Sequence, residues 1–227
     1  MLGGLKIARL VVLTLIAVLS TISACSKDKN PTRPPVGHGW SALGSGTNYM
    51  VNALTVYNGQ LMAGGSFPMA GGVIVHYVAA WDGSTWSALG SGMSGRNKAV
   101  CALAEYNGQL IAGGSFDVAG GVSARGIAAW EGSSWSALGS GLPGMHEAVY
   151  ALKEYNGRLI AGGYFVTVGG VSANYIAAWE GSSWSPLGAG TNKEVNALAV
   201  YNGRLIAGGD FDTAGAVSVS KIAAWSE

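Results

Sequence analysis

The chain has 227 residues, of which 37 are glycine and eight are tryptophan, while only 11% are charged. So much glycine and tryptophan with so little charge is unlike a helical protein and is typical of many short strands joined by tight turns. The 13 basic and 12 acidic residues give a formal net charge of +1 without forming a basic stripe. This balance provides no electrostatic basis for binding nucleic acid.

The first 24 residues have the pattern of an export signal. Lys6 and Arg9 form a short basic region, and residues 11–22 are an apolar run, shorter than the roughly 20 residues that span a bilayer. Residues 22–25, Ile-Ser-Ala-Cys, resemble the lipobox of bacterial lipoproteins. The resemblance implies that Cys25 is acylated, becomes the first residue after cleavage and anchors the chain to a membrane. An ordinary secretory signal with an incidental cysteine is the alternative.

Residues 25–39 carry this cysteine and then a polar, proline-rich stretch without hydrophobic period, which we interpret as a tether. Ser26 follows the cysteine, where an aspartate would resemble an inner-membrane retention signal. In a host with two membranes the outer one is therefore favoured. We expect a lipid-anchored protein of the bacterial cell envelope without a disulfide, because Cys101 has no partner cysteine.

Residues 40–227 contain four repeats of roughly 49 residues. Each repeat has a Tyr-Asn-Gly turn, and these begin at Tyr57, Tyr106, Tyr155 and Tyr201. In the first repeat we predict four strands, at residues 51–57, 60–67, 78–81 and 86–89. Asn58-Gly59 and Asp82-Gly83 provide tight turns between them. Four short antiparallel strands in each repeat predict the blade of a β-propeller.

The phase of the repeats predicts how such a propeller closes. The domain begins at Trp40 with a fourth strand that lacks its blade, and it ends at residues 222–225 with a third strand that lacks its fourth. Pairing these ends completes the last blade and covers the open sheet edges. The sequence therefore predicts an all-β, four-bladed β-propeller of four-stranded antiparallel blades, closed by pairing the N-terminal strand with the last blade. We expect a monomer; half of an eight-bladed dimer is the alternative.

The repeats resemble those of Kelch-like, galactose-oxidase-type β-propellers. The resemblance rests on the tryptophan of the third strand and on a diglycine after the second strand, at Gly64-Gly65, Gly113-Gly114, Gly162-Gly163 and Gly208-Gly209. The run Trp-x-x-Leu-Gly-x-Gly is also similar to repeats of bacterial surface proteins and of fungal cortical proteins. The resemblance implies a propeller and says almost nothing about activity. Kelch-like propellers usually have six or seven blades, so four is a departure from the pattern.

Comparison of the repeats separates constant connections from variable ones. The hairpin turns hardly vary and lie on one face, because such turns alternate between the ends of a blade. The opposite face carries the variable second-to-third and blade-to-blade connections, and variable loops on a rigid scaffold are the usual location of binding sites. Neutral drift after duplication is the alternative. The candidate ligand-binding residues in or beside these loops are Tyr49, His76, Tyr77, Arg96, His146, Tyr175 and Lys193.

The remaining residues favour binding over catalysis. The tryptophans have fixed places in the repeat, which favours packing between blades over a platform for sugars. His76 and His146 stand in different repeats, no metal-ligand spacing is present, and Asp117, Asp210 and Asp212 are interpreted as turn residues. We expect a non-enzymatic protein without cofactor or metal that binds a protein or a polysaccharide. A lectin with one site per blade and an envelope enzyme with a site at the channel mouth are the alternatives.

Overall fold

The structure is a computed structural model, and it describes residues 39–95 and 97–227. It divides the chain into a first unit that ends at Ser41 and a second unit, Ala42–Glu227, that holds every named strand. The predicted signal peptide, the lipidation site Cys25, the tether up to residue 38 and Arg96 lie outside the described residues. The part of the chain that is described contains no helix with the length and apolarity needed to cross a bilayer.

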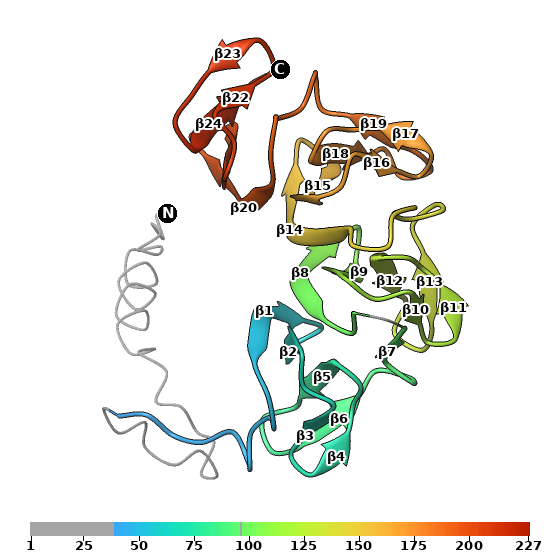
Figure 1. Cartoon of the computed structure of the whole chain (residues 1–227). Helices are drawn as coiled ribbons and strands as arrows, with labels where there is room; N and C mark the ends of the chain where they lie inside the picture. The colour runs from blue at the N-terminus through green and yellow to red at the C-terminus, as the bar shows by residue number, and fades with distance from the viewer. Residues whose placement is uncertain (1–38, 96) are drawn as a thin grey trace, which may run out of the picture. The chain divides into compact units, whose positions relative to one another are not determined.

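Four antiparallel sheets follow one another along the second unit, and we number them blades 1 to 4 (Figure 1). Blade 1 contains β1 (Val51–Tyr57), β2 (Gln60–Gly65), β5 (Val78–Trp81) and β6 (Trp86–Ala88). Blade 2 contains β8 (Val100–Tyr106), β9 (Gln109–Gly114), β12 (Ile127–Trp130) and β13 (Trp135–Ala137). Blade 3 contains β14 (Ala148–Tyr155), β15 (Arg158–Tyr164), β18 (Ile176–Trp179) and β19 (Trp184–Pro186). Blade 4 contains β20 (Val195–Tyr201), β21 (Arg204–Gly209) and β24 (Ile222–Trp225). The strand order confirms the predicted all-β architecture of propeller blades.

The first hairpin of each blade follows directly from its Asn-Gly dipeptide. In blade 1, Asn58 and Gly59 have φ angles of 49° and 75°, so both residues are in the left-handed region that a two-residue type I′ turn requires. Tyr57 pairs with Gln60 across this turn and sets the register of β1 against β2. The other three blades have the same turn at their own Asn-Gly dipeptides.

Asp82 holds the turn between β5 and β6. Its carboxylate accepts hydrogen bonds from the backbone N–H of Thr85 at 2.7 Å and from that of Ser84 at 2.8 Å. These two backbone bonds, followed by those from the Ser84 and Thr85 hydroxyls, hold the pKa of Asp82 well below its usual range. The turn therefore ends with Trp81 opposite Trp86, where the last strand of the blade begins.

A small additional hairpin lies between the second and third strands, where the sequence predicted only a variable loop. In blade 1, β3 (Met69–Ala70) pairs with β4 (Val73–Ile74) across Gly71 and Gly72. The equivalents are β10 (Val118–Ala119) with β11 (Val122–Ser123), β16 (Thr167–Val168) with β17 (Val171–Ser172), and β22 (Thr213–Ala214) with β23 (Val217–Ser218). β7 (Met93–Ser94) pairs with β10 and ties that hairpin to the segment that enters blade 2.

Aromatic side chains join each blade to the next. Four equivalent phenylalanines, Phe67, Phe116, Phe165 and Phe211, are completely or almost completely buried. The indole N–H groups of Trp86, Trp135 and Trp184 donate to the carbonyl oxygens of Leu43, Leu89 and Leu138, which precede their blades, at 2.9, 2.9 and 3.0 Å. Trp135 and Trp184 are each 4% exposed. The structure therefore places these tryptophans in the packing between blades.

Blade 4 differs from the others because its sheet has three strands. In the structure β24 pairs with β21 alone, and residues 40–43 form no strand. The closing pair predicted from the phase of the repeats is therefore not among the observed strand pairs.

Candidate functional site

The constant hairpin turns of a blade lie together on one face, as predicted. In blade 2, Gln109, next to the first turn, donates to the carboxylate of Glu131 in the second turn at 3.4 Å. In blade 3, Arg158 occupies the position of Gln109 and contacts Glu180 at 3.4 Å. Because both turns of a blade meet in this way, the variable connections are left on the opposite face.

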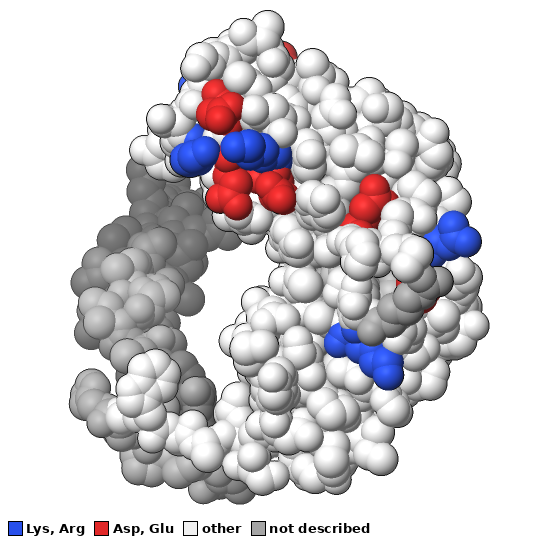
Figure 2. Space-filling model, viewed as in Figure 1, with Lys and Arg blue, Asp and Glu red and all other residues white. Residues whose placement is uncertain are grey.

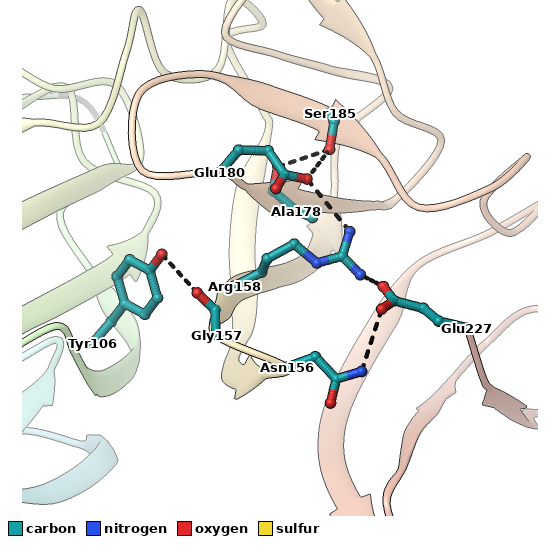
Figure 3. A network of polar contacts seen from close by, with 8 residues as sticks. All are labelled: Tyr106, Asn156, Gly157, Arg158, Ala178, Glu180, Ser185 and Glu227. Carbon is teal, nitrogen blue, oxygen red and sulfur yellow. Dashed lines mark hydrogen bonds and ion pairs between the residues drawn. The ribbon is translucent and has the colours of Figure 1, made fainter.

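Polar contacts on the constant face join neighbouring blades. The Arg158 guanidinium bridges the carboxylates of Glu180 and Glu227, and Glu227 also accepts from the Asn156 amide at 3.3 Å (Figure 3). On the other side, the Tyr106 hydroxyl of blade 2 donates to the carbonyl oxygen of Gly157 at 3.1 Å (Figure 3). The turns of this face therefore take part in contacts between blades.

The variable face begins at a β-bulge in the first strand of every blade. Register shifts follow Val51, Val100, Val149 and Val195, so the next residue in each strand has no partner across the ladder. Those bulged residues are Asn52, Cys101, Tyr150 and Asn196. Bulges redirect side chains and are frequent beside functional sites. The backbone bulge is therefore the same in every blade, whereas the side chain at the bulged position differs between blades.

Blade 3 has an aromatic pocket of about 240 Å³ on this face. It is lined by Gly144, His146, Glu147, Tyr164, Phe165, Val166 and Tyr175. The rings of Tyr164 and Tyr175 have centroids 6.3 Å apart and are tilted by 39°. Glu147 accepts from the backbone N–H of Gly144 at 2.6 Å and of Val166 at 3.4 Å, so its carboxylate fixes two sides of the rim.

The backbone at Tyr175 is strained. Asn174 and Tyr175 have φ angles of 43° and 70°, and a bulky residue in this left-handed region is uncommon. Blade 2 has Gly126 at the position of Tyr175, with φ of 84°, which costs a glycine little. Strain of this kind persists where the surrounding structure imposes it and is often found at binding sites. Tyr175 therefore stands in the pocket at a conformational cost that a glycine avoids.

A second, more open groove of about 350 Å³ shares Tyr175 with the pocket. Asn192 closes its far end, because its side-chain oxygen accepts from the backbone N–H groups of Asp212 and Thr213 at 3.0 and 3.1 Å. The Asn192 amide also donates to the Asp212 carboxylate at 2.6 Å, and Lys193 lies 3.8 Å from that carboxylate. The hydrogen bond from Asn192 is the main cause that lowers the pKa of Asp212.

On the face seen in Figure 2, charged side chains gather near this polar end. Figure 2 shows that most of the visible surface is uncharged and that acidic and basic side chains gather over the last blade. They include Lys193 with Asp212, and Lys221, whose ammonium donates to the carbonyl oxygen of Asp210 at 2.8 Å. The groove therefore runs from an aromatic pocket in blade 3 to a mixed-charge cluster in blade 4.

Tyr150 and Cys101 form a less polar environment on the innermost strands. Burial is the main cause that raises the pKa of Tyr150, and the nearby Cys101, Glu194 and Tyr164 raise it further. Burial also raises the pKa of the Cys101 thiol. Both groups are therefore neutral near pH 7, and neither is prepared to act as a base or nucleophile.

The structure brings some of the predicted site residues together and separates others. His146 and Tyr175 line the same pocket, and Lys193 belongs to the polar end of the adjoining groove. His76 and Tyr77 lie in blade 1, with ring centroids 6.5 Å apart. Tyr49 is 62% exposed in the bend before β1. Arg96 lies outside the described residues, so its place in a site stays a prediction.

Two polar side chains of the pocket, those of Tyr164 and Glu147, were not among the predicted site residues. Tyr164 ends β15, directly after the diglycine, where the sister repeats have Ser66, Ser115 and Asp210. This position differs between repeats as strongly as the loops do, and that variation is the signal that identifies it. Glu147 was seen only as part of a loop, because its two backbone hydrogen bonds depend on how the loop folds over β15.

The described residues contain no group of three or more histidines, cysteines, aspartates and glutamates placed to hold a metal ion. No protein-family profile matches the sequence, and no curated protein matches it. Among solved structures, the chain is similar to the computationally designed Ika4 protein, with a TM-score of 0.47 and 16% identity over 79% of this chain and 92% of that one. It is also similar to the computationally designed Ika8 protein, with a TM-score of 0.46 and 18% identity over 79% of this chain and 46% of that one.

Proposed function

We propose that this chain is a non-enzymatic protein of the bacterial cell envelope that is anchored by lipid, in the outer membrane. Its variable face binds a protein or polysaccharide partner. The observation that carries the binding role is the pocket of Tyr164 and Tyr175, because the other blades do not repeat this pair of tyrosines. Apolar and aromatic walls with a few placed polar groups are typical of binding sites. The anchor rests on Cys25 in its lipobox-like context, and the diglycines support Kelch-like repeats.

The pocket and the groove that shares Tyr175 suit an extended ligand. Together they offer aromatic rings, the Glu147 carboxylate and the side chains around Asn192 along one path across blades 3 and 4. A sugar chain or a polypeptide segment presents apolar and hydrogen-bonding groups in alternation and could contact these residues in turn. Cys101 and Tyr150, on the innermost strands, are neutral near pH 7 and offer no acid–base pair, which favours binding over catalysis.

A lectin is the second candidate, and the tyrosine pair favours it because aromatic rings stack on the apolar faces of sugars. The pair is not repeated, since the counterparts of Tyr164 are Ser66, Ser115 and Asp210. The lectin that the structure favours therefore has one site in blade 3, and a stoichiometry near one distinguishes it from a lectin with one site per blade.

The binding site is tested with the purified full chain in detergent on an array of glycans and envelope polysaccharides. We expect Tyr175→Ala to weaken saturable binding at least tenfold, about 1.4 kcal/mol, because it removes one wall of both hollows. Tyr77→Ala is the matched control, because Tyr77 has the same place in blade 1 and is also in the left-handed region. Binding that Tyr175→Ala leaves unchanged contradicts the proposed site, whereas equal loss in both variants indicates one site per blade.

The anchor is tested by incorporation of labelled palmitate in cells. We expect Cys25→Ser to abolish labelling, because acylation requires the thiol that the lipobox-like residues present. Cys101→Ser is the control, since it removes the other cysteine and leaves the signal unchanged. Labelling that persists in Cys25→Ser refutes the lipoprotein assignment and leaves the binding face to be judged separately.

A further inference from the structure

The edge of blade 4 has an apolar cavity of about 300 Å³ beside β24. Its lining includes Ile176, Leu187, Leu205, Ala223 and Trp225. In blades 1 to 3 the corresponding space, next to the third strand, is filled by the tryptophan that begins the fourth strand. The cavity is therefore the place where the repeat puts a tryptophan.

The glycines of the small hairpins show this equivalence directly. A β-carbon built on Gly71, Gly120 or Gly169 comes within 2.8, 2.8 or 2.6 Å of the Cδ1 atom of the tryptophan in its own blade. Those tryptophans are Trp86, Trp135 and Trp184. A β-carbon built on Gly215, the equivalent in blade 4, has nothing within 4 Å. Blade 4 thus keeps the glycine that makes room for an indole.

The segment that fits is at the start of the domain. Residues 40–44, Trp-Ser-Ala-Leu-Gly, are identical to residues 86–90, which form the fourth strand of blade 1 and the turn after it. Trp40 is fully exposed. The pairing of Trp81 with Trp86 and of Ala79 with Ala88 puts Trp40 opposite Trp225 and Ala42 opposite Ala223. The Trp40 indole N–H would then donate to the carbonyl oxygen of Leu187, as Trp184 donates to Leu138.

The first strands of the blades show the same pattern: residues that contact the next blade elsewhere have no such contact between blade 4 and blade 1. The hydroxyls of Tyr57, Tyr106 and Tyr155 donate to the carbonyl oxygens of Gly108, Gly157 and Gly203 in the next blade at 3.0, 3.1 and 3.2 Å. Tyr201, the fourth member of this series, is 68% exposed. Its acceptor by the repeat is Gly59 in blade 1, and the surrounding β1 side chains Leu54 and Val56 are 61% and 62% exposed.

A glycine–valine contact repeats the pattern. β-Carbons built on Gly64, Gly113 and Gly162 lie within 2.6 Å of a methyl carbon of Val100, Val149 and Val195 in the next blade. A β-carbon on Gly208 in blade 4 meets nothing nearer than the carbonyl oxygen of Lys221, at 3.9 Å. Val51, the fourth valine, is 42% exposed on blade 1. Blade 4 and blade 1 therefore carry the two halves of a joint that three other pairs of blades have formed.

The exposed halves indicate which molecule completes the joint. If each of the three formed joints turned the chain by a quarter, the first and last blades of one chain would meet and Tyr201, Leu54 and Val56 would be buried. They are exposed, so the turn at each joint is smaller and a closed ring needs more than four blades. Two copies of these four blades would supply eight blades to such a ring.

We propose that residues 40–43 of a second copy complete blade 4, with the Trp40 indole in the cavity beside β24. The exchange is reciprocal, so two chains close one ring through two identical joints related by a two-fold axis. The outer edge of β24 then receives the hydrogen-bonding strand that an exposed edge otherwise lacks. This inference does not depend on the proposed binding function.

The test uses the full chain, purified in detergent, with Cys101→Ser as background. Ala42→Cys and Ala223→Cys place two thiols opposite each other across the proposed strand pair, and a short bifunctional maleimide joins them. Ala128→Cys with Ala137→Cys is the matched control, because these residues are paired within blade 2. Chains that carry only one of the two substitutions, with tags of different size, are also expressed together.

We expect the first pair to give a covalent dimer on a denaturing gel, the mixed single variants to join one large and one small chain, and the control to react within one chain. A product confined to one chain overturns the proposal in favour of a four-bladed ring closed by its own N-terminal strand. No product with Ala42→Cys and Ala223→Cys, while the control reacts, also overturns it. Trp40→Ala in the same background should lower the yield of covalent dimer at least tenfold.

Discussion

The bulged positions show how one residue in a repeat acquires its own chemistry while its neighbours stay fixed. Asn52 donates from its side chain to the carbonyl oxygen of Val100 at 3.2 Å and so helps to join blade 1 to blade 2. At the same position in the next blade, Cys101 has no hydrogen bond among the described residues and lies in a setting whose burial raises the pKa of its thiol. Cys101 is in turn one of the groups that raise the pKa of Tyr150, the bulged residue of blade 3, although burial is the main cause there.

We therefore predict that Cys101 alkylates slowly. The thiolate is the reactive form, so a raised pKa lowers the reactive fraction at pH 8 and moves the midpoint of the pH–rate profile above the ordinary value of 9.0. Because the folded chain holds this proton more tightly than the unfolded chain, stability falls as the pH rises through 9.0 toward the higher folded pKa.

The measurement is the rate of reaction with iodoacetamide between pH 7 and 10, followed by mass spectrometry. Ser87→Cys in the Cys101→Ser background is the control, because Ser87 is exposed on β6. The pH–rate profile of the control should have its midpoint near the ordinary value of 9.0, and denaturant should move the midpoint of Cys101 to that value. A Cys101 midpoint at or below 9.0 in the folded chain argues against the buried setting.

At the scale of the strands, close contact between blades depends on the first glycine of each diglycine. Gly113 lies on β9, with Val149 of the next blade against it, and a β-carbon there would be 2.6 Å from the Val149 methyl carbon. Gly208 has the same place on β21 and no such neighbour within its own chain. The diglycines therefore serve the approach of the next blade, and in this position no turn or positive φ is involved.

Alanine substitution at these two glycines should have different effects. Gly113→Ala overpacks an existing joint and should lower the free energy of unfolding by about 1–3 kcal/mol. Gly208→Ala should leave the dissociated chain as stable as the original, and should reduce dimer formation because its methyl meets Val51 of the second copy. Chemical denaturation and the yield of the crosslinked dimer measure the two effects, and a destabilisation of the dissociated chain by Gly208→Ala as large as that by Gly113→Ala would contradict the assignment.

The strands and the site differ in how much the sequence could predict. β1 and β5 have the predicted bounds, whereas β2 ends two residues early because Ser66 leaves the ladder and donates its N–H to Met50 at 2.9 Å. The small hairpins were missed, since strands of two residues show no alternation. His146 and Tyr175 were predicted from variation between repeats. Their meeting with Tyr164 depends on how a loop and a strand end fold together, which no local pattern encodes.

The repeats predict how many blades this sequence forms, but they do not predict how the blades close into a ring. The sequence predicts four blades because it counts strands, and it favours a monomer because the two ends supply the missing parts of one blade. The turn between blades depends instead on side-chain packing, such as Gly162 against Val195, and is not visible in a count. The exposure of Tyr201 and Leu54 is the structural observation that bears on it.

A ring shared by two chains makes stability depend on concentration. Since dimerisation stabilises only the folded state, we predict that Tm rises with protein concentration in detergent, by about 1–3 °C for each tenfold increase, which is worth about 1.4 kcal/mol of dimer. Trp40→Ala should remove this dependence by emptying the cavity beside β24. Tyr49→Ala is the control, because Tyr49 is also exposed near the start of the domain and has no place in the proposed joint. If Tm does not depend on concentration in the original chain or in either variant, each chain closes its own ring. If Tm still depends on concentration in Trp40→Ala, the chains associate through another surface.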